Sequence, residues 1–140
     1  MRCCFITLLF IGLQINVSAQ NNHSVKQDSV LKTTDLKGTQ WEEWNMLDTT
    51  WIKHMFPSCL LENHLELNCR KCVTAYITVQ MKIDSKGKLV SHKLIESNIC
   101  GKDASEKLIN CFLDFFYFIE FPNELRNIIF EVKLGNSLKC

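Results

Sequence analysis

The sequence predicts an α+β domain in which a three-stranded antiparallel sheet carries helices on one face. Three observations predict this class. Residues 73–84 alternate between apolar and polar side chains, a turn containing a glycine follows at residues 84–88, and apolar side chains recur at helical spacing along residues 104–115. The expected order is helix, strand, strand, helix, strand, all within a single domain at residues 41–140.

Residues 41–63 are predicted to form one or two short amphipathic helices. Apolar side chains recur there at steps of three and four residues, and Pro57 interrupts the pattern. Three of these side chains are tryptophans, Trp41, Trp44 and Trp51. A helix packed on a sheet accounts for such a stripe, and an exposed recognition patch is the alternative.

The alternation at residues 73–84 is typical of a long strand with one buried face and one solvated face. Gly87 can supply the positive φ that a tight hairpin turn requires, and residues 89–96 are expected to return as the antiparallel partner. Residues 127–134 alternate again and predict a third strand that ends at Gly135.

A helix is expected to begin near residue 103, between the second and third predicted strands. Asp103 and Glu106 have the spacing of a capping box, and the helix has to stop before Pro122. The aromatic run at residues 116–121 is expected to be largely buried or paired, because exposed apolar segments of this kind promote aggregation.

The first nineteen residues have the composition of a signal peptide. Arg2 gives a positive start, residues 3–13 are mostly apolar, and residues 17–19 form a cleavage site of small residues. The apolar run is shorter than the roughly 20 residues that a membrane-spanning helix needs. We expect cleavage after Ala19, a periplasmic or secreted protein without a membrane span, and a flexible polar lead-in at residues 20–40; an uncleaved anchor is the alternative.

Charge excludes two classes of partner. The chain has 16 Lys and Arg against 15 Asp and Glu, and loss of Arg2 with the signal peptide leaves 15 of each. A neutral chain without a cluster of basic residues lacks the electrostatic footprint of a protein that binds nucleic acid or anionic lipid.

Cysteine usage predicts disulfides. Six cysteines remain after the expected cleavage, and an even number in a short exported chain is typical of structural bridges, although 15 complete pairings are possible. The candidates are Cys59, Cys69, Cys72, Cys100, Cys111 and Cys140.

Two chemical alternatives use the same cysteines. Cys69 and Cys72 form a C-x-x-C pair, which in thiol–disulfide catalysts stands at a helix N-terminus, whereas here it runs into a predicted strand. With Cys59 and His64 the pair would supply four zinc ligands, but a second C-x-x-C is absent. Because no nucleophile, metal or phosphate motif occurs elsewhere, we expect no enzyme, no cofactor and no metal.

In the order of its motifs, the chain resembles the periplasmic C-terminal domain of TonB over residues 57–134. The motifs are residues 81–89 (MKIDSKGKL), 94–97 (LIES), 118–122 (FIEFP) and 127–134 (NIIFEVKL). The membrane anchor and the Pro-rich arm of TonB itself are not present, and His92 stands where an aliphatic residue is common. The resemblance therefore implies the fold more strongly than it implies energy transduction.

The resemblance also implies a binding mode. In the family, the final strand accepts an extended segment of an outer-membrane receptor by β-augmentation. The accepting edge would here be residues 127–134, with Asn127, Ile129, Glu131 and Lys133 as the contacting residues. A protein partner, such as an outer-membrane receptor or a cell-envelope component, is thus expected. A thiol-redox protein and a purely structural, disulfide-stabilised secreted protein are the alternatives.

Overall fold

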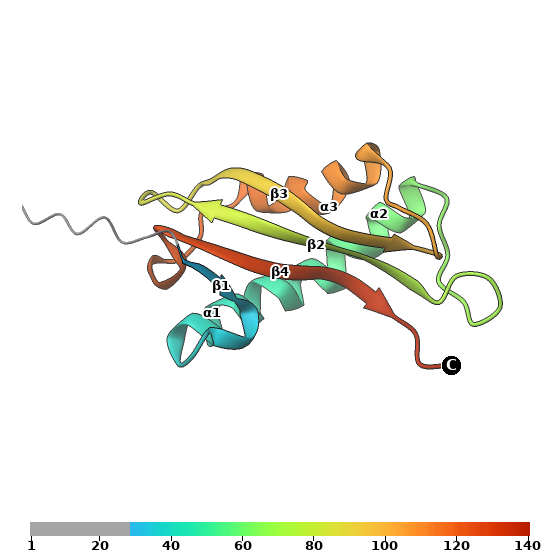
Figure 1. Ribbon diagram of the computed structural model, residues 1–140, viewed down its shortest axis with the longest axis horizontal. Helices are drawn as coiled ribbons and strands as arrows, with labels where there is room; N and C mark the ends of the chain where they lie inside the picture. The colour runs from blue at the N-terminus through green and yellow to red at the C-terminus, as the bar shows by residue number, and fades with distance from the viewer. Residues whose placement is uncertain (1–28) are drawn as a thin grey trace, which may run out of the picture.

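A computed structural model of the protein describes residues 29–140. Four strands form one sheet in the order β1-β4-β2-β3, and the helices lie on one of its faces (Figure 1). The strands are β1 (Val30–Lys32), β2 (Thr74–Ile83), β3 (Leu89–Ile99) and β4 (Ile128–Ser137). The predicted α+β class is confirmed. The prediction of three antiparallel strands is wrong, because β1 adds a fourth strand that pairs parallel with β4.

Within the polar segment predicted at residues 20–40, residues 30–40 are more ordered than predicted. β1 is followed by a 3-10 turn, η1 (Thr33–Asp35), and helix α1 begins at Thr39. Leu31 packs against the core, which gives this segment an apolar anchor. The prediction of a flexible lead-in is therefore wrong from residue 30 onward. Residues 20–28 and the predicted signal peptide with its cleavage site lie outside the described residues.

Residues 39–62, between β1 and β2, form one continuous helical stretch. It consists of α1 (Thr39–Thr50), the π-helical turn η2 (Trp51–Met55) and α2 (Phe56–Glu62). The predicted interruption near Pro57 takes the form of η2, which directly precedes α2. Proline has no N–H to donate to the preceding turn, so a widened turn before it is expected. Within residues 29–140, none of the helices has the length and apolarity to cross a bilayer.

Two of the three tryptophans pack between the helices and the sheet, as the packing interpretation predicts. Trp44 meets Phe130 of β4 edge-on, with ring centroids 5.1 Å apart, and Trp51 is fully buried. The indole Nε1 of Trp51 donates to the carbonyl of Phe112 at 3.0 Å, so its burial leaves no donor unpaired. Trp41 is different, because 47% of its surface remains exposed.

Helix α3 (Glu106–Phe118) covers the same face of the sheet. Its N-cap is Ser105, whose hydroxyl accepts from the backbone N–H of Leu108 at 3.3 Å, so the predicted capping box at Asp103 is wrong by position. The aromatic run after it divides in two. Phe116 and Phe121 are buried, whereas Phe118 is 84% exposed, so the expectation of a largely buried run holds at its two ends and fails at Phe118.

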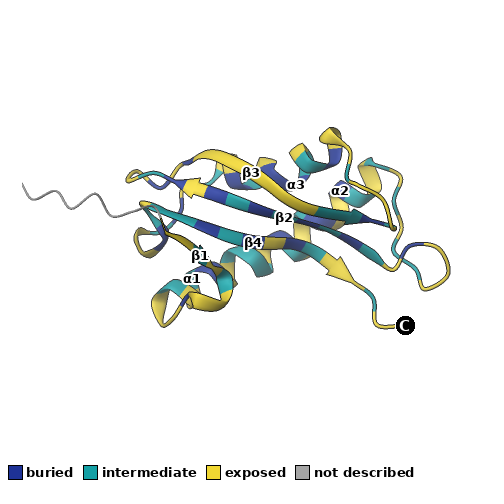
Figure 2. Cartoon of the chain, viewed as in Figure 1, coloured by how far each residue is buried: buried dark blue, intermediate teal, exposed yellow. Residues whose placement is uncertain are grey.

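The hairpin of β2 and β3 confirms the strongest pattern in the sequence. Buried and half-buried residues alternate along β2, as Figure 2 shows. β3 continues three residues beyond the predicted end at residue 96, and β4 continues past Gly135. Gly135 does not end its strand. Its missing side chain allows β4 to lie close to β2, because a Cβ there would be 2.2 Å from the carbonyl oxygen of Ala75.

Three disulfides hold the described residues together. One joins α2 to α3, and the other two join the loop before β2 to the C-terminal tail and to the end of β3. The pairs are Cys59–Cys111, Cys69–Cys140 and Cys72–Cys100. Disulfides of this kind form in oxidising compartments, which fits a secreted or periplasmic protein.

Candidate partner-binding edge

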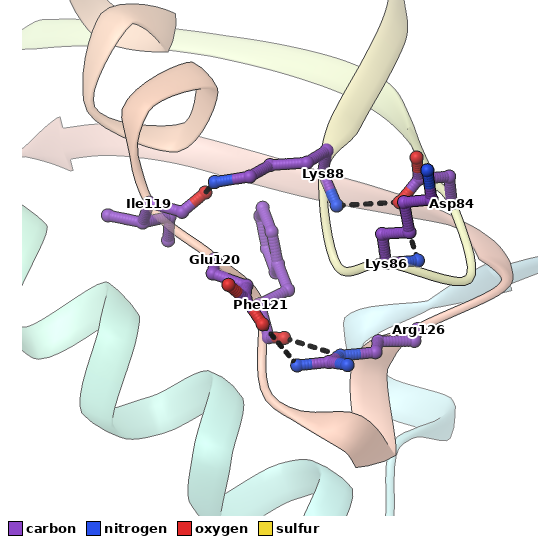
Figure 3. Close-up of polar contacts among 7 residues, drawn as sticks. All are labelled: Asp84, Lys86, Lys88, Ile119, Glu120, Phe121 and Arg126. Atoms are coloured by element: carbon purple, nitrogen blue, oxygen red, sulfur yellow. Dashed lines mark hydrogen bonds and ion pairs between the residues drawn. The ribbon is translucent and has the colours of Figure 1, made fainter.

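The start of β4 is fixed by the turn between β2 and β3 (Figure 3). The carboxylate of Asp84 accepts from the backbone N–H groups of Lys86 and Lys88, both at 2.8 Å, which closes the turn. The carbonyl of Asp84 accepts from the N–H of Asn127 at 3.1 Å. Asn127 has a φ of +56°, a value that asparagine tolerates better than most residues. The turn thereby sets where β4 begins.

Gly87 brings the same turn against the segment that leads into β4. Its carbonyl accepts from the N–H of Phe121 at 2.8 Å, and a Cβ at Gly87 would lie 2.5 Å from the Phe121 carbonyl oxygen. Arg126 closes this contact, because its guanidinium donates to that carbonyl and forms an ion pair with Glu120 at 2.7 Å (Figure 3). The turn at residues 84–88 is therefore held by hydrogen bonds against residues 120–127, the segment that leads into β4.

The backbone of β4 offers its pairing groups alternately to its two sides. Leu138 donates its N–H to Val73 at 2.7 Å, and the antiparallel register with β2 runs unbroken from Ser137 back to Ile128. In an antiparallel pair, every second residue bonds to the partner strand and the residues between them direct N–H and C=O away. By this alternation, the residues that face away from β2 are Ile129, Glu131, Lys133, Gly135 and Ser137.

β1 covers only the first part of this edge. It pairs in register with Ile129, Phe130 and Glu131, and the chain turns away at η1 immediately afterwards. The prediction that residues 127–134 form a fully open edge is therefore wrong along Ile129–Glu131. Figure 1 shows β1 beside the first half of β4. From Lys133 onward, no strand of the described residues pairs on this side.

The open part of the edge is short and well defined. The N–H and C=O of Lys133 and of Gly135 have no partner strand within residues 29–140. The N–H of Ser137 is already bonded to the side-chain oxygen of Asn136 at 2.8 Å. An unpaired row of this kind is what an added extended segment requires.

The side chains beside the open edge are polar and contact one another or side chains of the neighbouring strands. The ammonium group of Lys133 lies 3.4 Å from the ring centroid of Tyr76 on β2, in a cation–π contact. The Tyr76 hydroxyl donates to the carboxylate of Glu96 on β3, and this hydrogen bond is the main cause that raises the pKa of Tyr76 above its ordinary value. Glu131 accepts from the amide of Gln80 at 3.2 Å. The four predicted contact residues thus divide between the covered part (Ile129, Glu131), the open part (Lys133) and the turn before β4 (Asn127).

The C-x-x-C pair does not form a disulfide with itself. Cys69 is bonded to Cys140 and Cys72 to Cys100. In this arrangement neither Cys69 nor Cys72 carries the free thiolate with which a C-x-x-C catalyst attacks a disulfide. It also occupies the thiols that were considered as zinc ligands, and no cluster of three potential metal ligands occurs among residues 29–140.

The histidine that departs from the TonB pattern has a local partner. His92 of β3 lies 2.7 Å from the Tyr117 hydroxyl, with Nδ1 as the bonded nitrogen. This contact places His92 against α3 as a hydrogen-bonded residue of the sheet. Every fully buried side chain of the described residues is apolar, so the candidate functional groups lie on the surface.

The feature that sequence reasoning missed is β1. Its three residues, Val30, Leu31 and Lys32, are too few to show a strand period within a polar surrounding sequence. Comparison of the chain with models of protein families, with curated proteins and with solved structures finds no match.

Proposed function

We propose that this chain is a protein-binding module of an oxidising, extracytoplasmic compartment and that it takes up an extended segment of another protein along β4. One observation carries the proposal. β4 presents regularly spaced backbone groups at Lys133 and Gly135, immediately beyond the point where the chain already adds a strand of its own.

The chemistry of such binding is mostly that of the backbone. Each added hydrogen bond contributes a net free energy of about 0.5–1.5 kcal/mol, and the alternate side chains of the added strand supply selectivity. On the solvated face a partner would lie beside Lys133 and end near Glu131, which carries the opposite charge. A partner is therefore selected by its charge pattern as well as by its ability to extend.

The likeness of residues 57–134 to the TonB C-terminal domain supports the same mode of binding and suggests a source for the partner. On that likeness, the segment would belong to an outer-membrane receptor or another cell-envelope component. The turn motif at residues 84–88 belongs to that likeness. Its hydrogen bonds to residues 120–127 position the start of the accepting strand, β4, which gives the motif a physical role.

The experiment that tests the proposal compares two substitutions of one residue. Lys133→Pro removes an N–H from the open edge, where proline is tolerated because no ladder bond is lost. Lys133→Ala removes the same side chain but keeps the N–H. Purified wild type and both variants, shown by circular dichroism to be folded, are used to capture partners from an envelope extract of the source organism.

The expected result is that wild type and Lys133→Ala recover the same partner in similar amounts. Lys133→Pro is expected to recover at least about tenfold less of it, since two or more strand bonds depend on this N–H and its neighbours. Equal recovery by Lys133→Pro and wild type would contradict the proposal. The substitution is placed at Lys133 because the N–H of Ile129 faces β1 rather than solvent.

A further inference from the structure

β1 is attached to the sheet by few interactions. It has three residues, of which Val30 and Lys32 are exposed and Leu31 is half-buried against the core. No disulfide reaches it, and the one side-chain hydrogen bond at β1 is local, from the Lys32 N–H to Asp35 at 2.9 Å. By the alternation along β4, the backbone groups of Ile129 and Glu131 face the residue between them, Leu31.

We infer that β1 is a built-in substitute for the partner's strand and that the partner segment runs parallel to β4, displaces β1 and pairs from Ile129 to Gly135. This inference rests on the proposed function and specifies its ligand. The full edge of seven residues is more than twice the length of β1, so a partner that covers it forms bonds that β1 does not.

The register of β1 also indicates the chemistry of the partner segment. Leu31 lies opposite Phe130, on the face of the sheet that the helices cover, and Lys32 lies opposite Glu131. A strand that continued in the same register would place an apolar residue opposite Val132 and, next, a residue opposite Lys133. Charge complementarity favours an acidic residue there. The expected segment is apolar, basic, apolar, acidic in order, beginning opposite Phe130.

Competition by β1 follows from its covalent attachment. A strand tethered within a few residues of its site acts at an effective concentration in the millimolar range or higher, so a free segment has to overcome it. Weakening β1 therefore raises the apparent affinity for a segment that uses the same edge. A segment that uses only residues 133–137 gains nothing from that change.

Two peptides of identical composition test the inference. The first, Val-Leu-Lys-Val-Glu-Val-Thr, has the pattern expected opposite residues 129–135. The second exchanges its Lys and Glu, which places like charges opposite Glu131 and Lys133. Each peptide carries a fluorophore, and its binding to the full mature chain is measured by anisotropy.

Two proline variants form the matched pair. Leu31→Pro removes the N–H that faces β4 and releases β1, whereas Val30→Pro alters a residue whose N–H faces away from β4. If Leu31→Pro should not fold, Leu31→Ser replaces it, because serine keeps the N–H but lacks the apolar anchor. Folding is checked by circular dichroism for every variant.

The expected result is that the first peptide binds Leu31→Pro at least about tenfold more tightly than it binds wild type or Val30→Pro. The second peptide binds Leu31→Pro at least about tenfold more weakly than the first does, and the double variant Glu131→Lys with Lys133→Glu reverses this preference.

Three results would overturn the inference. Equal affinity of the first peptide for wild type and Leu31→Pro would show that β1 does not compete, and absence of binding to Leu31→Pro would show that this edge takes no parallel strand. Concentration-dependent dimers of wild type, broken by Leu31→Pro, would assign the edge to β1 of a second copy. In each case the capture experiment with Lys133→Pro decides separately whether the proposed function stands.

Discussion

The two strands that flank β2 differ in the regularity of their pairing with it. β4 pairs with β2 over ten consecutive residues without a shift in register. β3, on the other side, pairs with β2 with two register shifts, at Thr78/Val79 and at Lys82/Ile83. Bulges of this kind break the even spacing of the outward backbone groups and twist a strand away from a flat neighbour. They are a recognised protection against further strand pairing.

The side chains reinforce the difference. β3 is exposed along most of its length (Figure 2), and Lys93 and Glu96 place charges along it. β4 has no bulge, and its protection is a separate segment, β1, that covers three of its residues. The outer side of β3 is thus unsuited to pairing through its own geometry, whereas the outer side of β4 is covered only in part, by the three residues of β1. A binding role is better supported for the second.

The largest effect is expected at Gly135, where the backbone of β2 leaves no room for a Cβ on β4. In Gly135→Ala, the new Cβ would lie 2.2 Å from the Ala75 carbonyl oxygen and 2.6 Å from the Tyr76 Cα, both backbone atoms, at a φ of +129°. We expect a loss of about 4 kcal/mol or more of unfolding free energy, measured by urea denaturation. The control is Gly101→Ala beyond β3, where φ is +82° but the new Cβ would have none of the surrounding atoms within 4 Å. A loss of about 1 kcal/mol of unfolding free energy is expected there. Similar losses at both positions would contradict the close approach at β4.

A smaller effect is expected from the disulfides that tie the two edge strands. Cys140 follows β4 and is bonded to Cys69, and Cys100 follows β3 and is bonded to Cys72. Replacing either pair by serine is expected to cost about 2–4 kcal/mol in urea unfolding without reductant. Partner capture is expected to fall only for the Cys69 and Cys140 double variant, because only that pair restrains the end of β4. Equal capture by the two double variants would remove the distinction between the edges.

Local patterns in the sequence predict the parts of this fold that depend on neighbours along the chain. The alternation in β2 and the turn at residues 84–88 needed only side-chain period and glycine to be recognised. The start of α3 was missed by two residues, because Asp103 and Ser105 are both good N-caps and the choice depends on how the loop after Gly101 is held.

The candidate site was only partly predictable, because a sheet edge is defined by contacts between distant segments. Alternation along residues 127–134 groups Ile129, Glu131 and Lys133 on one face, but it does not decide which edge their backbone groups meet, because that depends on the register with β2. That β1 covers two of the three was not predictable, because three residues carry too little periodicity to indicate a strand or its partner. The disulfide pairing was open for the same reason, as spacing does not distinguish among 15 arrangements.

Hydrogen exchange should resolve the alternation along β4 without any mutation. The amides of Val132 and Leu134 face β2, whereas those of Lys133 and Gly135 face the open edge. We expect the first two to exchange at least about a hundredfold more slowly than the second two in NMR measurements, since strand bonds open only through larger fluctuations. Equal protection of all four amides would mean that another chain already covers the edge in solution.

The smallest effect is expected at Tyr76, which lies on β2 between the two edges. Its hydroxyl donates to Glu96 of β3, and this bond raises the pKa of Tyr76. Because the pKa is higher in the folded state, the bond stabilises the fold below the ordinary pKa of tyrosine, and that contribution is lost as the pH rises through the folded-state pKa.

The chain has two tyrosines, so Tyr117→Phe leaves Tyr76 as the only phenol. In that background, Glu96→Gln is expected to move phenolate formation, followed by absorbance, to lower pH, because an amide does not disfavour the phenolate as a carboxylate does. An unchanged titration would show that β3 is not joined to β2 through this pair, so that Lys133 of β4 is the only charged partner of Tyr76.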